Sequence, residues 1–114
     1  MNVNEKIRSL EQVTGYPVMP DVYRGTEDRY IIFTYEDERA ALKADNEELA
    51  DTAWLQVTLF TPENYNYFAD KKKIKKALKD QGFIVDSVKS WLEGRNNEIR
   101  HTVFSVNITE AEEE

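Results

Sequence analysis

The sequence predicts an α+β fold in which an antiparallel β-sheet carries two α-helices packed on one face, a two-layer sandwich. Helix-like and strand-like patterns alternate along the 114 residues. The last two strand patterns are joined by a short polar turn, which is typical of antiparallel neighbours. The length is that of one domain, which we place at residues 1–109. The acidic tail at residues 110–114 is expected to be disordered because its like charges repel one another.

The first element is a short amphipathic helix over residues 3–14. Its apolar residues recur at helical spacing as Val3, Ile7, Leu10 and Val13. Asn2 and Glu5 have the spacing of a capping box, and Gly15 suits the C-terminal cap. Because a helix of about three turns is marginal in isolation, we expect it to dock on the sheet.

Two strands are predicted next, a short one at residues 21–24 and a longer one at 29–35 that is rich in β-branched and aromatic residues. Residues 36–51 then carry two acidic clusters around a segment whose propensity favours a helix. Since this segment lies between two strands and lacks a continuous apolar stripe, we interpret it as a protruding acidic loop or hairpin. Long excursions of this kind are usually functional or disordered.

The clearest strand covers residues 52–61. One face consists of Ala53, Leu55, Val57 and Leu59, and the other, which is mixed, of Trp54, Gln56, Thr58 and Phe60. Such alternation indicates a strand with one face in the core. A subunit interface often has the mixed character of the second face.

Residues 62–81 are predicted to form the second helix. Thr61 suits an N-cap followed by Pro62 at the first helical position, and Gly82 suits the end. Phe60 and Tyr65 are spaced for a hydrophobic staple. Lys71 falls on the apolar stripe, where we expect its stem to lie along the sheet.

Two further strands are predicted at residues 83–92 and 99–109, with residues 93–98 as a polar hairpin turn. The last strand places Thr102, Phe104, Val106 and Ile108 on one face. The order is therefore helix, two strands, acidic excursion, strand, helix and two strands.

Residue counts argue against several kinds of chemistry. The sequence has no cysteine, which excludes disulfides and thiolate sites, and its single histidine, His101, lacks the partners of a zinc site. The acidic clusters lack the glycine and the register of a calcium loop. We find no pattern of catalytic residues and no phosphate-binding loop. We therefore expect no enzymatic activity, no cofactor and no metal site.

The only basic cluster lies in the second predicted helix, at Lys71, Lys72, Lys73, Lys75, Lys76 and Lys79. Successive helical residues point about 100° apart, which indicates a solvated outer face. If the cluster binds anything, an acidic surface of another subunit fits better than nucleic acid, because the net charge is −7. Segment 36–51 and the tail of the same chain are candidates. The sequence has no signal peptide pattern and no apolar run of about 20 residues, so we expect no membrane contact.

Candidate interface residues come from the mixed strand face and the acidic excursion. They are Trp54, Thr58, Glu36, Asp37, Glu38, Glu47 and Glu48. Tryptophan dominates binding hot spots, although core packing explains Trp54 equally well.

The chain resembles the small tail completion proteins of long-tailed phages and prophages, a family that includes tail terminator and head–tail joining proteins. Three stretches carry the resemblance: the strand at residues 54–61, the helix end at 76–83, and the final hairpin at 99–106. The likeness covers residues 3–109. The acidic segment and the glutamate tail are not features that we map onto this family.

The resemblance implies a non-enzymatic structural protein with an α+β fold. Such proteins assemble as rings, typically hexamers, that cap the tail tube and join it to the head connector. The implied location is the virion tail, or the host bacterial cytoplasm before assembly. The alternative is a small acidic binding protein, such as an immunity factor or an inhibitor that mimics the charge of nucleic acid.

Overall fold

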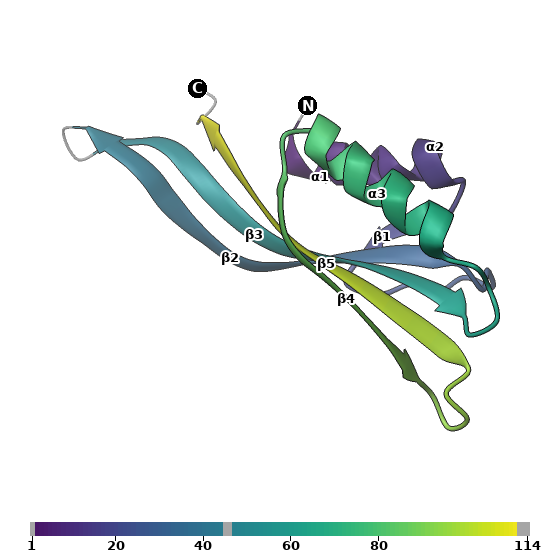
Figure 1. The fold of residues 1–114 in the computed structure, drawn as a ribbon. Helices are drawn as coiled ribbons and strands as arrows, with labels where there is room; N and C mark the ends of the chain where they lie inside the picture. Colours follow the sequence, from purple (N-terminus) through teal and green to yellow (C-terminus); the bar gives the residue numbers. More distant parts are fainter. Residues whose placement is uncertain (1, 45–46, 112–114) are drawn as a thin grey trace.

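The computed structural model of the chain describes residues 2–44 and 47–111. The elements are α1 (Val3–Arg8), α2 (Leu10–Thr14), β1 (Val18–Pro20), β2 (Tyr30–Ala44), β3 (Glu47–Pro62), α3 (Phe68–Asp80), β4 (Ile84–Glu93) and β5 (Ile99–Ala111). All three helices lie on one side of a single twisted sheet, and the other side is open (Figure 1). The predicted α+β class is confirmed.

The sheet has the strand order β1-β2-β3-β5-β4, and its pairs are antiparallel except for β1, which runs parallel to β2. The sheet is therefore mixed, and the first strand lies at residues 18–20 instead of the predicted 21–24. The extended link between Pro17 and Pro20 is itself the edge strand, anchored where the Ile31 N–H donates to the Pro17 carbonyl at 2.8 Å. Asp21 then adopts a positive φ of 62°, which turns the chain away from the sheet.

The N-terminal segment forms two short helices separated at Ser9, whose hydroxyl donates to the Lys6 carbonyl at 2.6 Å. The caps follow the sequence. The Glu5 N–H donates to the Asn2 side chain at 2.9 Å, and Gly15 takes the left-handed conformation with a φ of 77°. Ile7 and Leu10 are fully buried, so this segment is held by the sheet on which it docks.

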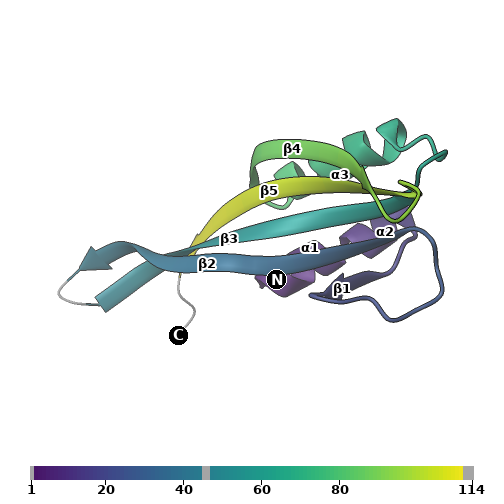
Figure 2. The same ribbon diagram turned by 90° about the horizontal axis from the view of Figure 1, so that it is seen from below.

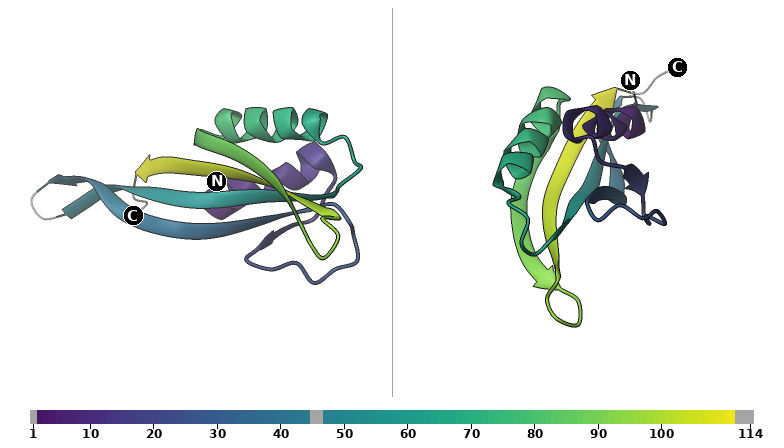
Figure 3. Two further views of the ribbon diagram at one scale, coloured as in Figure 1. Left: turned by 60° about the horizontal axis from the view of Figure 1, so that its bottom comes forward. Right: turned by 90° about the vertical axis from the view of Figure 1, so that its right-hand side faces the viewer.

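Strands β2 and β3 are long, with 15 and 16 residues, and pair with each other as an antiparallel hairpin. They continue beyond the helix-covered part of the sheet as an arm, which we define as residues 36–44 and 47–52 (Figures 1 and 3). The register shifts at three places in the pairing, the first of them between Tyr35 and Asp37, at the base of the arm. The arm makes the molecule elongated, with extents of 55 × 26 × 25 Å.

Helix α3 begins at Phe68, six residues later than predicted. The proposed cap at Thr61 and Pro62 is wrong, because both residues remain in β3, where Pro62 pairs with Ile99. The proposed staple is also absent. Phe60 faces the open side of the sheet, where its ring stacks on Tyr30, whereas the Tyr65 hydroxyl meets Tyr16 at the end of α2. A positive φ of 96° at Gly82 turns the chain after the helix as expected.

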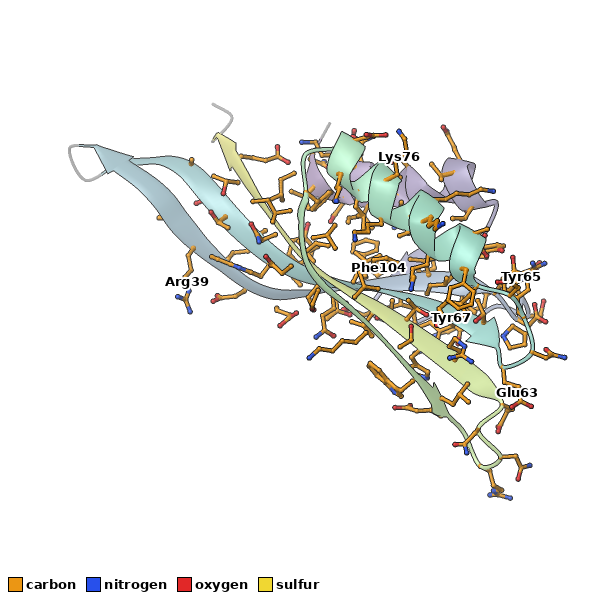
Figure 4. The ribbon with its side chains drawn as sticks, viewed as in Figure 1. Arg39, Glu63, Tyr65, Tyr67, Lys76 and Phe104 are labelled. Atoms are coloured by element: carbon orange, nitrogen blue, oxygen red, sulfur yellow. The ribbon has the colours of Figure 1, made fainter. Side chains whose placement is uncertain are left out.

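The hydrophobic core fills the space between the helices and the sheet. Phe104 lies at its centre, fully buried, and points from β5 toward the helices (Figure 4). The sheet contributes alternate residues, and α3 contributes Ile74 and Leu78. The core side chains of the two central strands β3 and β5 include Leu55, Val57, Leu59, Phe104, Val106 and Ile108, which lie on the faces that the alternation predicts.

The C-terminal hairpin joins β4 to β5 as expected. Strand β5 continues through Ala111, where it pairs with Ala50. Glu110 and Ala111 thus lie in the sheet instead of in a disordered tail. The rest of that predicted tail, residues 112–114, lies outside the described residues.

Candidate interaction surface

Five rings cross the open face of the sheet at the end opposite the arm. We call Tyr23, Tyr30, Phe60, His101 and Trp91 the aromatic row. The last four are direct cross-strand partners on β2, β3, β5 and β4, so the strand register itself aligns them. No helix covers this face, which is turned toward the viewer in Figure 2.

The rings of the aromatic row contact one another in sequence. The centroid distances are 4.4 Å for Tyr23–Tyr30, 4.7 Å for Tyr30–Phe60, 4.5 Å for Phe60–His101 and 5.6 Å for His101–Trp91. Stacked and edge-on pairs at these distances add stability beyond the area that they bury. Trp91 remains 40% exposed, and the other four rings are half-buried. The row is thus an ordered apolar surface in contact with solvent.

Carboxylates lie beside both ends of the aromatic row. Glu93 accepts a hydrogen bond from the Trp91 indole at 2.6 Å and lies 3.3 Å from Nε2 of His101. Next to the row is a pocket of about 330 Å³ whose apolar walls include Tyr30 and Phe60. Its lining also includes Glu27, Asp28 and Glu98. An occupant of this surface therefore meets aromatic rings in the centre and negative charge at the margin.

Four of the seven predicted interface residues, Trp54, Glu36, Asp37 and Glu38, lie at the base of the arm. Trp54 lies half-buried on the open face, with the Arg39 guanidinium 5.8 Å from its ring. Arg39 in turn pairs with Asp37 at 2.8 Å. Glu36 sits in the register shift and is exposed, as is Glu38. These residues form a charged surface around one tryptophan.

The remaining predicted interface residues are more dispersed. Thr58 is half-buried in the middle of the open face, between Ile32 and Val103 of the neighbouring strands. Glu47 and Glu48 belong to β3 in the arm, where they pair with Ala44 and Lys43. Their side chains lie outside what the structure describes.

Helix α3 presents lysines on the side away from the sheet. Lys72, Lys75, Lys76 and Lys79 border one shallow depression together with Asp80, and we call these four the lysine surface. Lys76 points away from the sheet (Figure 4) and pairs with Asp80 at 2.7 Å. Lys71 instead folds back over its own helix start. Its Nζ lies 5.7 Å from the Tyr67 ring and 5.3 Å from the Phe68 ring.

A polar network near the start of α3 connects that helix with Tyr16, which follows α2, and with Arg29, which precedes β2. The Tyr16 hydroxyl donates to the Asp70 carboxylate at 2.6 Å and lies 2.9 Å from the Tyr65 hydroxyl. The Arg29 guanidinium lies over both tyrosine rings, at 5.1 and 4.7 Å. Burial raises the pKa of Tyr16, and its hydrogen bond to Asp70 raises it further. Sequence reasoning missed this network, because its members are up to 54 residues apart.

Two buried polar atoms in the described part of the chain have no hydrogen-bond partner. One is Oγ1 of Thr61, and the other is Nε of Arg100, which pairs with Thr61 across the two strands. The Arg100 guanidinium lies 4.6 Å from the Tyr67 ring. The Tyr67 ring therefore stabilises the Arg100 charge by a cation–π contact, which requires no hydrogen bond.

Residues 2–44 and 47–111 contain no group of three residues able to hold a metal ion. Within the same ranges, no helix is both long and apolar enough to cross a membrane.

No protein-family model matches the chain, and no curated protein matches its sequence. Among solved structures, a chain from the virion of a native gene transfer agent particle is similar, with a TM-score of 0.63 and 16% sequence identity. That match covers 96% of this chain and 92% of the other. A second solved chain matches with a TM-score of 0.51 and 10% identity over 100% of this chain and 99% of its own. At such identities the likeness establishes the fold.

Proposed function

We propose that the chain is a structural subunit of a phage or prophage tail, which forms a ring that caps the tail tube and joins it to the head connector. The observation that carries the proposal is the shared fold with a virion chain over nearly the full length of both chains. The resemblance of residues 54–61, 76–83 and 99–106 to tail completion proteins points the same way.

The surfaces of the molecule suit such a subunit. One layer exposes lysines and the opposite face exposes an aromatic row with carboxylates, so neighbouring copies have complementary surfaces to use. The arm extends the sheet well past the core and can reach a tube or connector protein. The net charge of −7 would keep DNA from adhering to a channel that the subunits line. In this function the protein positions other proteins and carries out no reaction.

The test is electron microscopy of particles made by the native host after deletion of this gene. We expect tails of irregular length and heads without tails, because the tube would lack its cap and its joint. Complementation with the full chain should restore complete particles. A version lacking residues 38–48 should fold, since the core lies elsewhere, but should restore fewer joined particles.

Normal tail length and normal head joining in the deletion strain would overturn the proposal. A tight complex between the purified chain and a toxin or nuclease, together with normal particles, would instead support the acidic binding protein. Normal joining by the version that lacks residues 38–48 would show that the arm is not needed for the proposed function. It would leave the remainder of the proposal unchanged.

A further inference from the structure

The aromatic row is the largest set of described aromatic side chains that no helix covers. Its rings are held in register by four strands, and Glu93 fixes the outermost indole. Side chains so ordered lose little conformational entropy when a partner binds. Aromatic rings ordered in this way are typical of binding surfaces.

The charge near the aromatic row indicates what binds there. Glu27, Asp28 and Glu98 line the pocket beside the rings, and Glu93 borders Trp91. Arg29 and Arg100 adjoin the row in the chain, but their guanidinium groups lie over the rings of Tyr65 and Tyr67. The other positive residues closest to the row in the chain are Lys89 on β4, Arg24 next to Tyr23 and Arg95 in the turn after β4, so the carboxylates outnumber them. The surface therefore favours a partner that brings positive charge on long apolar stems.

The lysine surface of α3 has that chemistry. Lysine stems are apolar and can lie across rings while the ammonium groups reach carboxylates at the margin. The chain already uses this geometry within itself. Lys71 lies over Tyr67 and Phe68, and Arg39 lies over Trp54.

We propose that the aromatic row of one copy binds the lysine surface of a second copy. Nucleic acid is a poor alternative for the row, because the carboxylates beside both of its ends would repel phosphates. When the lysine surface docks on the row, its positive charges lie against the carboxylates at the margin. Such electrostatic complementarity favours one protein partner over others.

The contact has a geometric consequence. The lysine surface and the aromatic row lie on opposite layers of the molecule, so the contact is head-to-tail and leaves one unused surface of each kind on a pair of copies. Further copies can then add until a ring closes. The inference deepens the proposed function by naming the subunit contact, yet it is tested on the purified chain alone. Its failure would therefore leave the particle morphology result standing.

The experiment uses two complementary variants of the full chain. The first, Lys72→Glu/Lys75→Glu, loses the lysine surface and keeps the aromatic row. The second, Trp91→Ala/Glu27→Lys, loses the row and keeps the lysines. Both changes lie at exposed positions, so we expect both variants to fold, as circular dichroism would check. The control variant Lys73→Glu/Arg8→Glu changes the net charge by the same amount as the first variant, but at positions outside the lysine surface.

Sedimentation velocity would be measured from 10 μM to 1 mM chain in low and high salt. We expect the wild type and the control variant to self-associate in low salt and to dissociate in high salt, because exposed charges are screened. Each of the two complementary variants alone should associate at least about tenfold more weakly. Mixed together, they should form a one-to-one pair that grows no further.

Wild-type chain that stays monomeric to 1 mM in low salt would overturn the inference. Variants that associate as strongly as the wild type would also overturn it, as would a mixture that fails to pair at concentrations where the wild type associates. Pairs of the first variant with itself would indicate a symmetric contact and contradict the head-to-tail arrangement.

Discussion

The two faces of the same sheet differ in kind, although alternate residues of the same strands build them. Toward the helices, Leu55, Val57 and Phe104 are fully buried among aliphatic neighbours. Toward the solvent, Phe60 and His101 lie in a row of rings that remains partly exposed. The first face holds the fold together, whereas the second is ordered by its strands and is free for a partner. The comparison teaches that order and burial are separate properties of a sheet residue.

The largest expected effect separates the two faces directly. Phe104→Ala should lower the free energy of unfolding by about 3–5 kcal/mol, because it opens a cavity in the core. Phe60→Ala should cost about half as much or less, because its ring is already partly in water. Urea unfolding of both variants measures the difference. Equal losses would show that the open face is part of the core.

The polar network at the edge of the covered face gives the next effect. Tyr16→Phe should cost about 1–3 kcal/mol, because Asp70, only 6% exposed, loses its donor. The raised pKa of Tyr16 adds a pH signature. Unfolded tyrosine ionises near pH 10 while folded Tyr16 keeps its proton, so this part of the stability is complete below pH 10 and falls above it.

Unfolding free energies measured between pH 8 and 11 would check that signature. The wild type should lose stability at alkaline pH more steeply than Tyr16→Phe does. Tyr67→Phe is the matched control, since its hydroxyl has no contact with Asp70 among the described hydrogen bonds, and it should retain the wild-type slope. Identical slopes for all three chains would remove Tyr16 as the cause.

Several parts of the fold were predictable from local patterns. Alternation at residues 53–60 separated the two faces, and the caps at Asn2 and Gly15 followed from residue type. The start of α3 was not predictable in this way. Thr61 and Pro62 have the identity of a helix start, but pairing between β3 and β5 holds them in the sheet. Tertiary pairing outweighed the local preference.

The candidate surface was only partly predictable for the same reason. Trp54 and the acidic residues of segment 36–51 could be picked out by residue type, and their place at an interface stays a prediction. The aromatic row joins residues from Tyr23 to His101 and depends on the register of four strands, which alternation does not specify. In the sequence, the aromatic row is marked only by one aromatic residue on the uncovered side of each of these strands.

A smaller effect on stability is expected at the base of the arm. Trp54→Ala should leave the chain folded, with a loss of about 1–2 kcal/mol, and should lower the yield of complete particles in the complementation experiment. Thermal unfolding of the variant together with particle counts would check both parts. A chain that no longer folds would place Trp54 in the core and erase the distinction between the faces there.

The smallest effect concerns the covered face. Thr61→Val should raise stability by up to about 1 kcal/mol, because Thr61 is only 1% exposed and its buried hydroxyl has no partner among the described residues. Ser105 lies on β5 and on the open face of the sheet, where its side chain is half-buried. Ser105→Val should therefore change stability less. A destabilised Thr61→Val would mean that the hydroxyl does have a partner, such as bound water.

The sheet margins have a consequence for how copies can meet. Strand addition needs a free row of backbone groups, and β1 offers only three residues with Pro17 and Pro20 at its ends. The opposite margin, β4, is distorted where the register shifts between Val85 and Ser87, and it carries the exposed Lys89. Both devices discourage open-ended growth of a sheet from chain to chain. In the proposed assembly, contacts at these two margins are thereby directed to the faces of the sheet, whereas β2 beyond Phe33 pairs with β3 alone and keeps a free edge in the arm.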